Sequence, residues 1–124
     1  MKIIIQQTEL NDAIQNVSKA LSSRTTIPIL GGIKIEVTRM GVALTASDTD
    51  ITIQSYIPCQ IEDKTIVDVE REGSVVLPAK FFVDIIRKLS SSQVEIETGD
   101  HFQTMIRAAS TDIQLVGLDP EEFP

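Results

Sequence analysis

Both halves of this 124-residue chain carry the same order of predicted elements, and this repetition constrains the fold more than any other feature. The strings TDITI (49–53) and TDIQL (111–115) begin 62 positions apart, each after a run of small residues. We interpret each string as the beginning of the final strand of its half. Because short strings also recur by chance, the order of the elements carries the prediction of a repeat.

The first half, about residues 1–58, has the pattern strand, helix and three strands. A β-branched run over 2–6 precedes a helix expected over 8–22, with Thr8 as its N-cap. Pro28 disfavours helical geometry in its predecessor, so an ordered loop follows the helix. The apolar stripe of the helix consists of Leu10, Ile14, Val17 and Leu21. The three strands are expected at 33–37, 42–46 and 51–57.

The second half, about residues 65–118, repeats this order. A strand over 74–77 leads into a helix over 79–89, and Pro78 suits the first turn of that helix because it lacks an N–H. The apolar face of this helix consists of Phe82, Ile85, Ile86 and Leu89. Three further strands are expected at 93–98, 102–108 and 112–118. The charged stretch 60–72 is interpreted as a connector with one possible short strand at 65–69.

Length and composition predict that the two units form one domain over residues 1–124. Hydrophobic residues make up 42% and charged residues 23%, close to the average of globular proteins. Two β-α-β-β-β units can place both helices on one face of predominantly antiparallel sheets and bury both apolar stripes together. We therefore predict an α+β fold built from a tandem pseudo-repeat.

The sequence shows no spacing of histidine, cysteine or acidic residues that is typical of a catalytic site or a metal site. The single histidine, His101, falls in a predicted hairpin turn, and the single cysteine, Cys59, has no basic neighbour to activate it. The string SDTDIT begins like a calcium loop but lacks the glycine and the glutamate that such a loop requires. We expect no enzyme, no metal ion and no cofactor.

No apolar run reaches the length of a signal-peptide core or a membrane span, so we expect a cytoplasmic protein without a membrane partner.

Positive charge gathers on the predicted helices although the net charge is −7. That net charge opposes tight binding to phosphate backbones. The second helix nevertheless carries three cations against one acid, Asp84. One interpretation is a surface for the backbone of duplex nucleic acid, since aromatic residues, at 4%, are too few for base stacking. The other is an ordinary solvated face on which Asp84 pairs with Lys88 at i, i+4.

Four separated segments carry a resemblance to a known family: SSRTTIPILGGIKIE, GVALTASDTDI, GSVVLPAKFFVDIIRKL and LDPEEFP. In this order they resemble the first domain of the bacterial DNA polymerase III beta subunit, the sliding clamp. The family pattern Arg-x-Thr-Leu-Pro-Ile-Leu stands here as RTTIPIL, and Leu-Thr-x-x-Asp-x-(Asp/Glu)-Ile stands as LTASDTDI. The resemblance implies a DNA-clamp domain and a homodimeric ring of three similar domains per protomer, with helices lining a channel around duplex DNA.

The resemblance also implies site residues. Arg24 matches a DNA-contacting arginine after the first helix, Lys80 and Arg87 match basic positions of the second, and the helix face adds Lys88. On the last strand, Ile113 and Leu115 match apolar positions of the protomer interface. Because alternation puts both on one sheet face, burial in the domain's own core is the other interpretation.

In the family, the pocket for polymerase, clamp-loader and repair partners lies mainly on the third domain, so DNA polymerase III and the loader are expected to bind through domains absent from this chain. The expected function is a processivity-clamp domain. The alternative is a protein-interaction module that assembles through its sheet edge and never touches nucleic acid. The basic face of the second helix together with Arg24 favours the clamp, because assembly alone does not require it.

Overall fold

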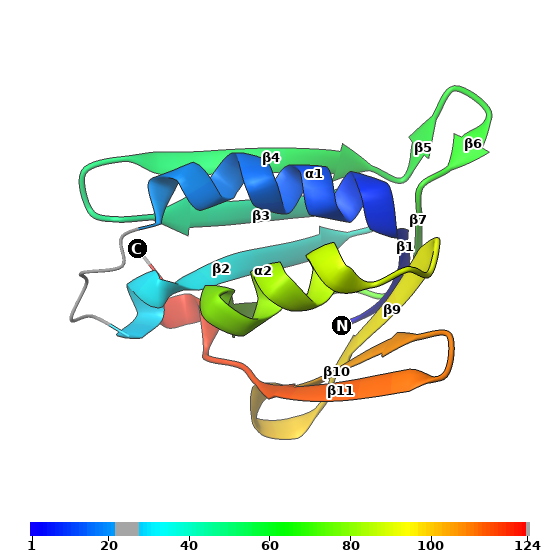
Figure 1. Ribbon diagram of the computed structural model, residues 1–124. Coiled ribbons are helices and arrows are strands. Elements are labelled where there is room, and N and C mark those ends of the chain that lie inside the picture. The colour runs from blue at the N-terminus through cyan, green and yellow to red at the C-terminus, as the bar shows by residue number, and fades with distance from the viewer. Residues whose placement is uncertain (22–27, 124) are drawn as a thin grey trace.

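The computed structural model describes residues 1–21 and 28–123, in which two helices cover one face of two antiparallel sheets. Helices α1 (Gln7–Val17) and α2 (Ala79–Lys88) pack against each other in front of the strands (Figure 1). The strands are β1 (Lys2–Gln6), β2 (Gly32–Thr38), β3 (Gly41–Ser47), β4 (Thr52–Pro58), β5 (Gln60–Ile61), β6 (Lys64–Thr65), β7 (Val67–Arg71), β8 (Gly73–Pro78), β9 (Gln93–Thr98), β10 (Gln103–Ala108) and β11 (Thr111–Val116). The predicted α+β fold with both helices on one face is confirmed.

The first strand of each half pairs with the three-stranded meander of the other half. Strand β1 leads into α1 but pairs with β9, in a sheet of order β11-β10-β9-β1-β7. Strand β8 leads into α2 but pairs with β2, in a sheet of order β4-β3-β2-β8. Each sheet therefore contains strands of both halves, and the two β-α-β-β-β units are interlocked.

The strand registers align the two helices residue by residue. Gln6 ends β1 and pairs with Gln93, the first residue of β9. Pro78 ends β8 and pairs with Gly32, the first residue of β2. Gln6 and Pro78 are also the extended residues that immediately precede the helices. Position 7 of α1 therefore corresponds to position 79 of α2, and equivalent helix residues differ by 79 − 7 = 72.

The apolar side of each helix is buried against the sheets, and both sides join the same hydrophobic cluster. The buried helix residues are Leu10, Ala13, Ile14 and Val17 of α1 and Ala79, Phe82 and Ile86 of α2. Leu21 and Leu89, predicted to extend the two stripes, lie just past the α-helical residues and are only partly buried against this cluster.

The boundaries of α1 differ from the prediction. The helix begins after Gln6, whereas Thr8 lies inside the first turn and is not the N-cap. The backbone N–H of Gln7 instead donates to the carbonyl of Ser92 at 2.9 Å, so a tertiary contact satisfies one free helix donor. The regular helix ends at Val17, where the Ser18 hydroxyl donates to the carbonyl of Ile14 at 2.6 Å and a 3₁₀ turn follows. Helix α2 begins at Ala79 as predicted, although Pro78 is its N-cap and not a residue of its first turn.

The stretch 60–72 is more than a connector. Its strand β7 pairs with β1 as an edge of the five-stranded sheet, two residues later than the predicted 65–69. Strands β5 and β6 form a small hairpin that projects at the upper right of Figure 1. The signal was weak because β7 alternates valine with acids, which is the pattern of an edge strand with one solvated face.

The strings TDITI and TDIQL do not occupy equivalent places. Ala108 pairs with Thr111, so TDIQL begins β11 as predicted. Ser47 pairs with Thr52, so the first three residues of TDITI lie in the turn 48–51 before β4. The Asp48 carboxylate accepts two backbone N–H bonds within that turn, at 3.0 and 2.8 Å. The repeat is therefore one of element order, and the similarity of the two strings is partly coincidence.

Gln7 links the two helices, and its removal is expected to cost stability. Its side-chain Nε2 donates to the carbonyl of Ile86 at 2.7 Å, in the last turn of α2, where carbonyls lack helical partners. Gln7→Ala should lower the free energy of unfolding by about 1 kcal/mol in a denaturant titration. Gln15→Ala, on the exposed side of α1, is the control and should change stability little. Equal stability of the two variants would show that the link contributes nothing.

Candidate nucleic-acid interface

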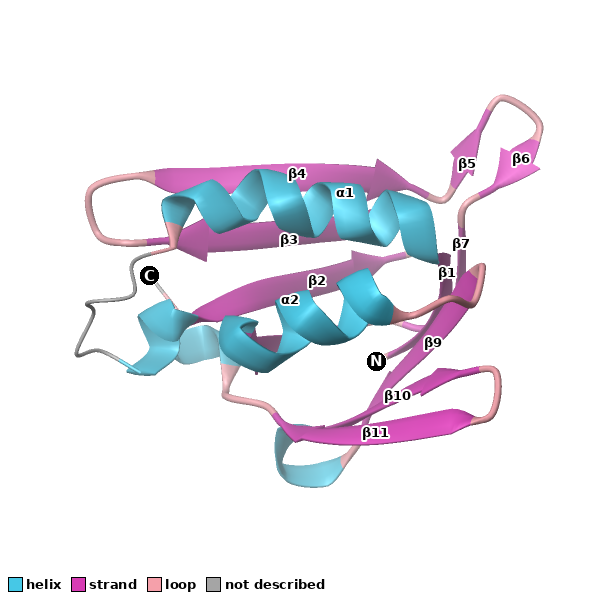
Figure 2. Ribbon diagram, viewed as in Figure 1, coloured by secondary structure: helices cyan, strands magenta, loops and turns pink. Residues whose placement is uncertain are grey.

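The solvent-facing sides of α1 and α2 form one surface on the side of the molecule away from the sheets, here called the outer helix face (Figure 2). Its exposed residues are Thr8, Asp12, Gln15 and Asn16 of α1 and Lys80, Phe81, Asp84, Arg87 and Lys88 of α2. The three sequence-predicted cations of the second helix thus lie together on one exposed helix surface. Arg24, the fourth, lies outside the described residues.

The positive charge of the outer helix face comes from α2 alone. The equivalent pairs are Thr8 and Lys80, Glu9 and Phe81, Asp12 and Asp84, Gln15 and Arg87, and Asn16 and Lys88. The five α1 positions carry two acids and no cation, a formal charge of −2. The five α2 positions carry three cations and one acid, a formal charge of 3 − 1 = +2. The pseudo-symmetry of the backbone is therefore broken by charge.

The cations of α2 are weakly engaged within the domain. Arg87 pairs with Asp84 at 2.9 Å, at i, i+3, and both side chains are 55% exposed. The expected Asp84–Lys88 pair does not form, and within the described residues neither Lys80 nor Lys88 makes an ion pair. Because an exposed ion pair contributes little, all three cations stay available to an external anion.

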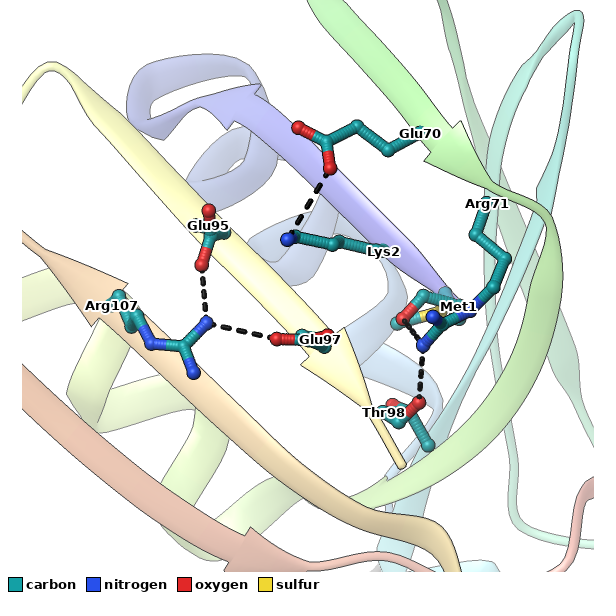
Figure 3. A network of polar contacts seen from close by, with 8 residues as sticks. All are labelled: Met1, Lys2, Glu70, Arg71, Glu95, Glu97, Thr98 and Arg107. Carbon is teal, nitrogen blue, oxygen red and sulfur yellow. Dashed lines mark hydrogen bonds and ion pairs between the residues drawn. The ribbon is translucent and has the colours of Figure 1, made fainter. Parts of the chain in front are cut away.

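On the five-stranded sheet, by contrast, Arg107 and Lys2 are paired with acids, and Arg71 donates to the backbone carbonyls of Met1 and Thr98 (Figure 3). The Arg107 guanidinium donates to Glu97 at 3.0 Å and also to Glu95, while Lys2 lies 3.4 Å from Glu70. The hydrogen bond from Arg107 lowers the pKa of Glu97, and the bonds to both glutamates raise the pKa of Arg107. These three cations therefore each have a partner within the domain, whereas Lys80 and Lys88 make no ion pair in the described residues.

Ile113 and Leu115 lie on β11, which forms an edge of the five-stranded sheet. Leu115 is 9% exposed and belongs to the hydrophobic cluster, whereas Ile113 is partly buried against it. Both lie on the inward side of the strand, as alternation predicts, while Val116 is exposed. The free edge of β11 has no partner strand among the described residues.

The other residues considered from the sequence lie apart from these surfaces. His101 is exposed in a 3₁₀ turn with a left-handed backbone, φ 56°. Burial raises the pKa of the partly buried Cys59 thiol, which is the opposite of activation. In the part of the chain that the structure describes, no three metal-ligating side chains group together, and neither helix is long and apolar enough to cross a membrane.

Comparison with known proteins gives a match along the whole chain. The family described as DNA polymerase III beta subunit, N-terminal domain, matches residues 1–124. The beta sliding clamps of Bacillus subtilis and Halalkalibacterium halodurans are 49% and 48% identical over 124 residues. These matches cover 100% of this chain but 33% of each relative, so the chain spans a third of the length of these relatives.

Solved structures show the same similarity. The crystal structure of the Bacillus subtilis DNA polymerase sliding clamp matches with a TM-score of 0.98 at 49% identity, covering 100% of this chain and 33% of that chain. The beta subunit of Streptococcus pyogenes DNA polymerase matches with a TM-score of 0.90 at 31% identity, covering 100% of this chain and 32% of that one. With the family match over every residue, the chain belongs to the DNA polymerase III beta subunit family, in which it corresponds to the N-terminal domain.

Proposed function

We propose that this chain is the first domain of a bacterial replicative sliding clamp, a ring without enzymatic activity that encircles duplex DNA. The ring makes DNA polymerase III processive by holding it on its template. The observation that carries the proposal is the exposed, net-positive surface of α2 on a protein whose net charge is −7. A clamp that is held by its closed shape needs only weak, sequence-independent phosphate contacts, and tight binding would prevent sliding.

Lys80, Arg87 and Lys88 are the proposed DNA contacts, together with Arg24 from the family pattern. The exposure of the three α2 side chains, and the absence of ion pairs at Lys80 and Lys88 in the described residues, support this assignment.

The proposed ring is a homodimer in which the β11 edge meets another protomer. The unpaired edge of β11 and the partial burial of Ile113 support this contact, with Leu115 behind it. DNA polymerase III and the clamp loader bind through domains outside this chain. A Helicobacter pylori beta clamp, 30% identical, was solved bound to a DNA ligase peptide, which supports short peptides as the partners of such clamps. The cytoplasm is the proposed location, where the replicating DNA lies.

A charge-matched pair of triple variants tests the DNA contact. Titration of the ¹⁵N-labelled chain with a short duplex at physiological salt should give a Kd of about 10⁻⁴ M or weaker, because a handful of cations works against −7 overall. Replacing Lys80, Arg87 and Lys88 with alanine should remove measurable binding without lowering the melting temperature, since solvated cations contribute little to stability.

The control triple replaces three lysines away from the helices, Lys2, Lys34 and Lys64, with alanine. Both triples have a formal net charge of −7 − 3 = −10, so they alter the average field equally. The control should retain duplex binding. Equal loss of duplex binding in both triple variants would show that binding depends on the net charge of the chain and not on the α2 surface. Wild-type binding by the α2 triple would refute the proposed contact and favour the assembly module.

A further inference from the structure

Phe81 is an exposed aromatic residue in the first turn of α2, next to Lys80 on the basic helix surface. Its side chain is 52% exposed, although its neighbour Phe82 is fully buried and supplies the core contact at this turn. Along α2, Phe81, Asp84 and Lys88 follow at i, i+3 and i+7 and form one exposed row, and Lys80 and Arg87 lie along one side of it. The equivalent residue of α1 is Glu9, so the exposed aromatic side chain has no counterpart on α1.

The aromatic ring of Phe81 lies beside a lysine. The ammonium of Lys80 lies 5.7 Å from the centroid of the Phe81 ring. Three hollows of the described surface lie at the β9–β10 turn, beside the β5–β6 hairpin and next to Ser91 and Arg107, and Phe81 lines none of these three. An exposed ring beside a lysine suits a polyanion that presents apolar edges next to its phosphates, because such a partner would contact both the cation and the ring.

We propose that Phe81 is a direct contact to duplex DNA, in which its ring packs against the deoxyribose edges of the backbone between phosphates neutralised by Lys80 and Lys88. The inference rests on the proposed function and extends it with a second kind of contact. Every nucleotide presents the same sugar edge, so the contact does not depend on sequence. It removes apolar surface from water without displacing counterions, so it adds affinity that does not depend on salt.

The salt dependence of duplex binding distinguishes the contribution of the Phe81 side chain from that of the cations. The duplex titration would be repeated at several salt concentrations for the wild-type chain, Phe81→Ala, Phe81→Leu and Lys88→Ala. We expect Phe81→Ala to weaken binding about fivefold at every salt concentration, and Phe81→Leu to weaken it about twofold because an apolar side chain remains. Lys88→Ala should reduce the slope of log K against log salt by about 0.9, the value for one phosphate contact.

Met40→Ala is the matched control, because Met40 is 75% exposed at the β2–β3 turn and belongs to neither the helices nor the proposed contact. It should bind like the wild type. Nuclear Overhauser contacts between the Phe81 ring protons and deoxyribose protons of the duplex would give support that needs no variant.

The outcomes distinguish this inference from the proposed function. Wild-type affinity of Phe81→Ala, with Lys88→Ala weakened, would overturn the ring contact and leave the phosphate contacts in place. A salt slope that changes in Phe81→Ala would overturn it too, because the ring would then act only by placing Lys80. Wild-type affinity and slope in both variants would overturn both proposals.

Discussion

Leu115→Glu is expected to unfold the domain, whereas Ile113→Glu is expected to leave it folded. Leu115 is 9% exposed inside the hydrophobic cluster, so a glutamate there would place an unpaired charge among apolar side chains. Such a change typically costs about 3–5 kcal/mol, which is a large share of the stability of a small domain. Ile113 is only partly buried, so its side chain can turn toward solvent at the free strand edge. Thermal melts followed by circular dichroism would separate the two.

The same pair tests the proposed protomer contact in a full-length clamp whose first domain is this chain. Ile113→Glu should shift the dimer toward monomers in analytical ultracentrifugation, because a charge at an apolar contact loses its solvation without gaining a partner. Gln114→Glu, on the exposed side of the same strand, is the control and should remain dimeric. A fully dimeric Ile113→Glu clamp would exclude this residue from the interface.

Gly41→Ala should be the most damaging of the small substitutions at glycine. Gly41 begins β3 with φ +157°, and a Cβ there would lie 2.3 Å from the carbonyl oxygen of Ile57 and 2.8 Å from the Tyr56 hydroxyl. The close backbone atom belongs to the paired strand β4 and cannot move without breaking that pairing. We expect a loss of about 3 kcal/mol or more in a denaturant titration.

Gly99→Ala provides the matched control, because no heavy atom lies within 4 Å of the position that the new methyl group would take, and the φ of Gly99 is −108°. It should change the free energy of unfolding by less than about 1 kcal/mol. Similar midpoints for the two alanine variants would contradict the steric account of Gly41.

Local patterns were enough to predict the elements but not their partners. Alternation and helical periodicity predicted both helices and the meander strands, although α1 ends at Val17 and not near residue 22. The exchange of β1 and β8 between the halves could not be predicted, because an apolar strand such as KIIIQ packs equally well beside either meander. The end of α1 depends on the Ser18 hydroxyl bond to the backbone, and a helical pattern does not reveal that competition.

For the candidate site, too, the sequence predicted which residues share a face but not which side chains pair. The i, i+4, i+7 and i+8 spacing of Lys80, Asp84, Arg87 and Lys88 placed them on one exposed face, which the structure bears out. The choice of salt-bridge partner depended on side-chain rotamers, so Asp84 pairs with Arg87 rather than Lys88. Helical periodicity already put Phe82 and not Phe81 on the apolar face, but only the structure shows that Phe81 is 52% exposed with its ring beside Lys80.

Burial on the last strand was only half predictable. Alternation placed Ile113 and Leu115 on the inward face, but the depth of burial depends on the elements that cover each position. Leu115 lies in the hydrophobic cluster, whereas Ile113 lies at its margin. This difference gives the two residues different expected roles, which the sequence could not separate.

The central claim is that the outer helix face, and no sheet surface, contacts duplex DNA. The most direct test is paramagnetic broadening of the amide signals of the ¹⁵N-labelled chain by a short duplex that carries a spin label. We predict broadening at residues 79–88 of α2, with weaker effects along 7–17 of α1, and none on the outward residues of β9 and β10. Broadening centred on the outer face of the five-stranded sheet, or at the β11 edge alone, would contradict the claim.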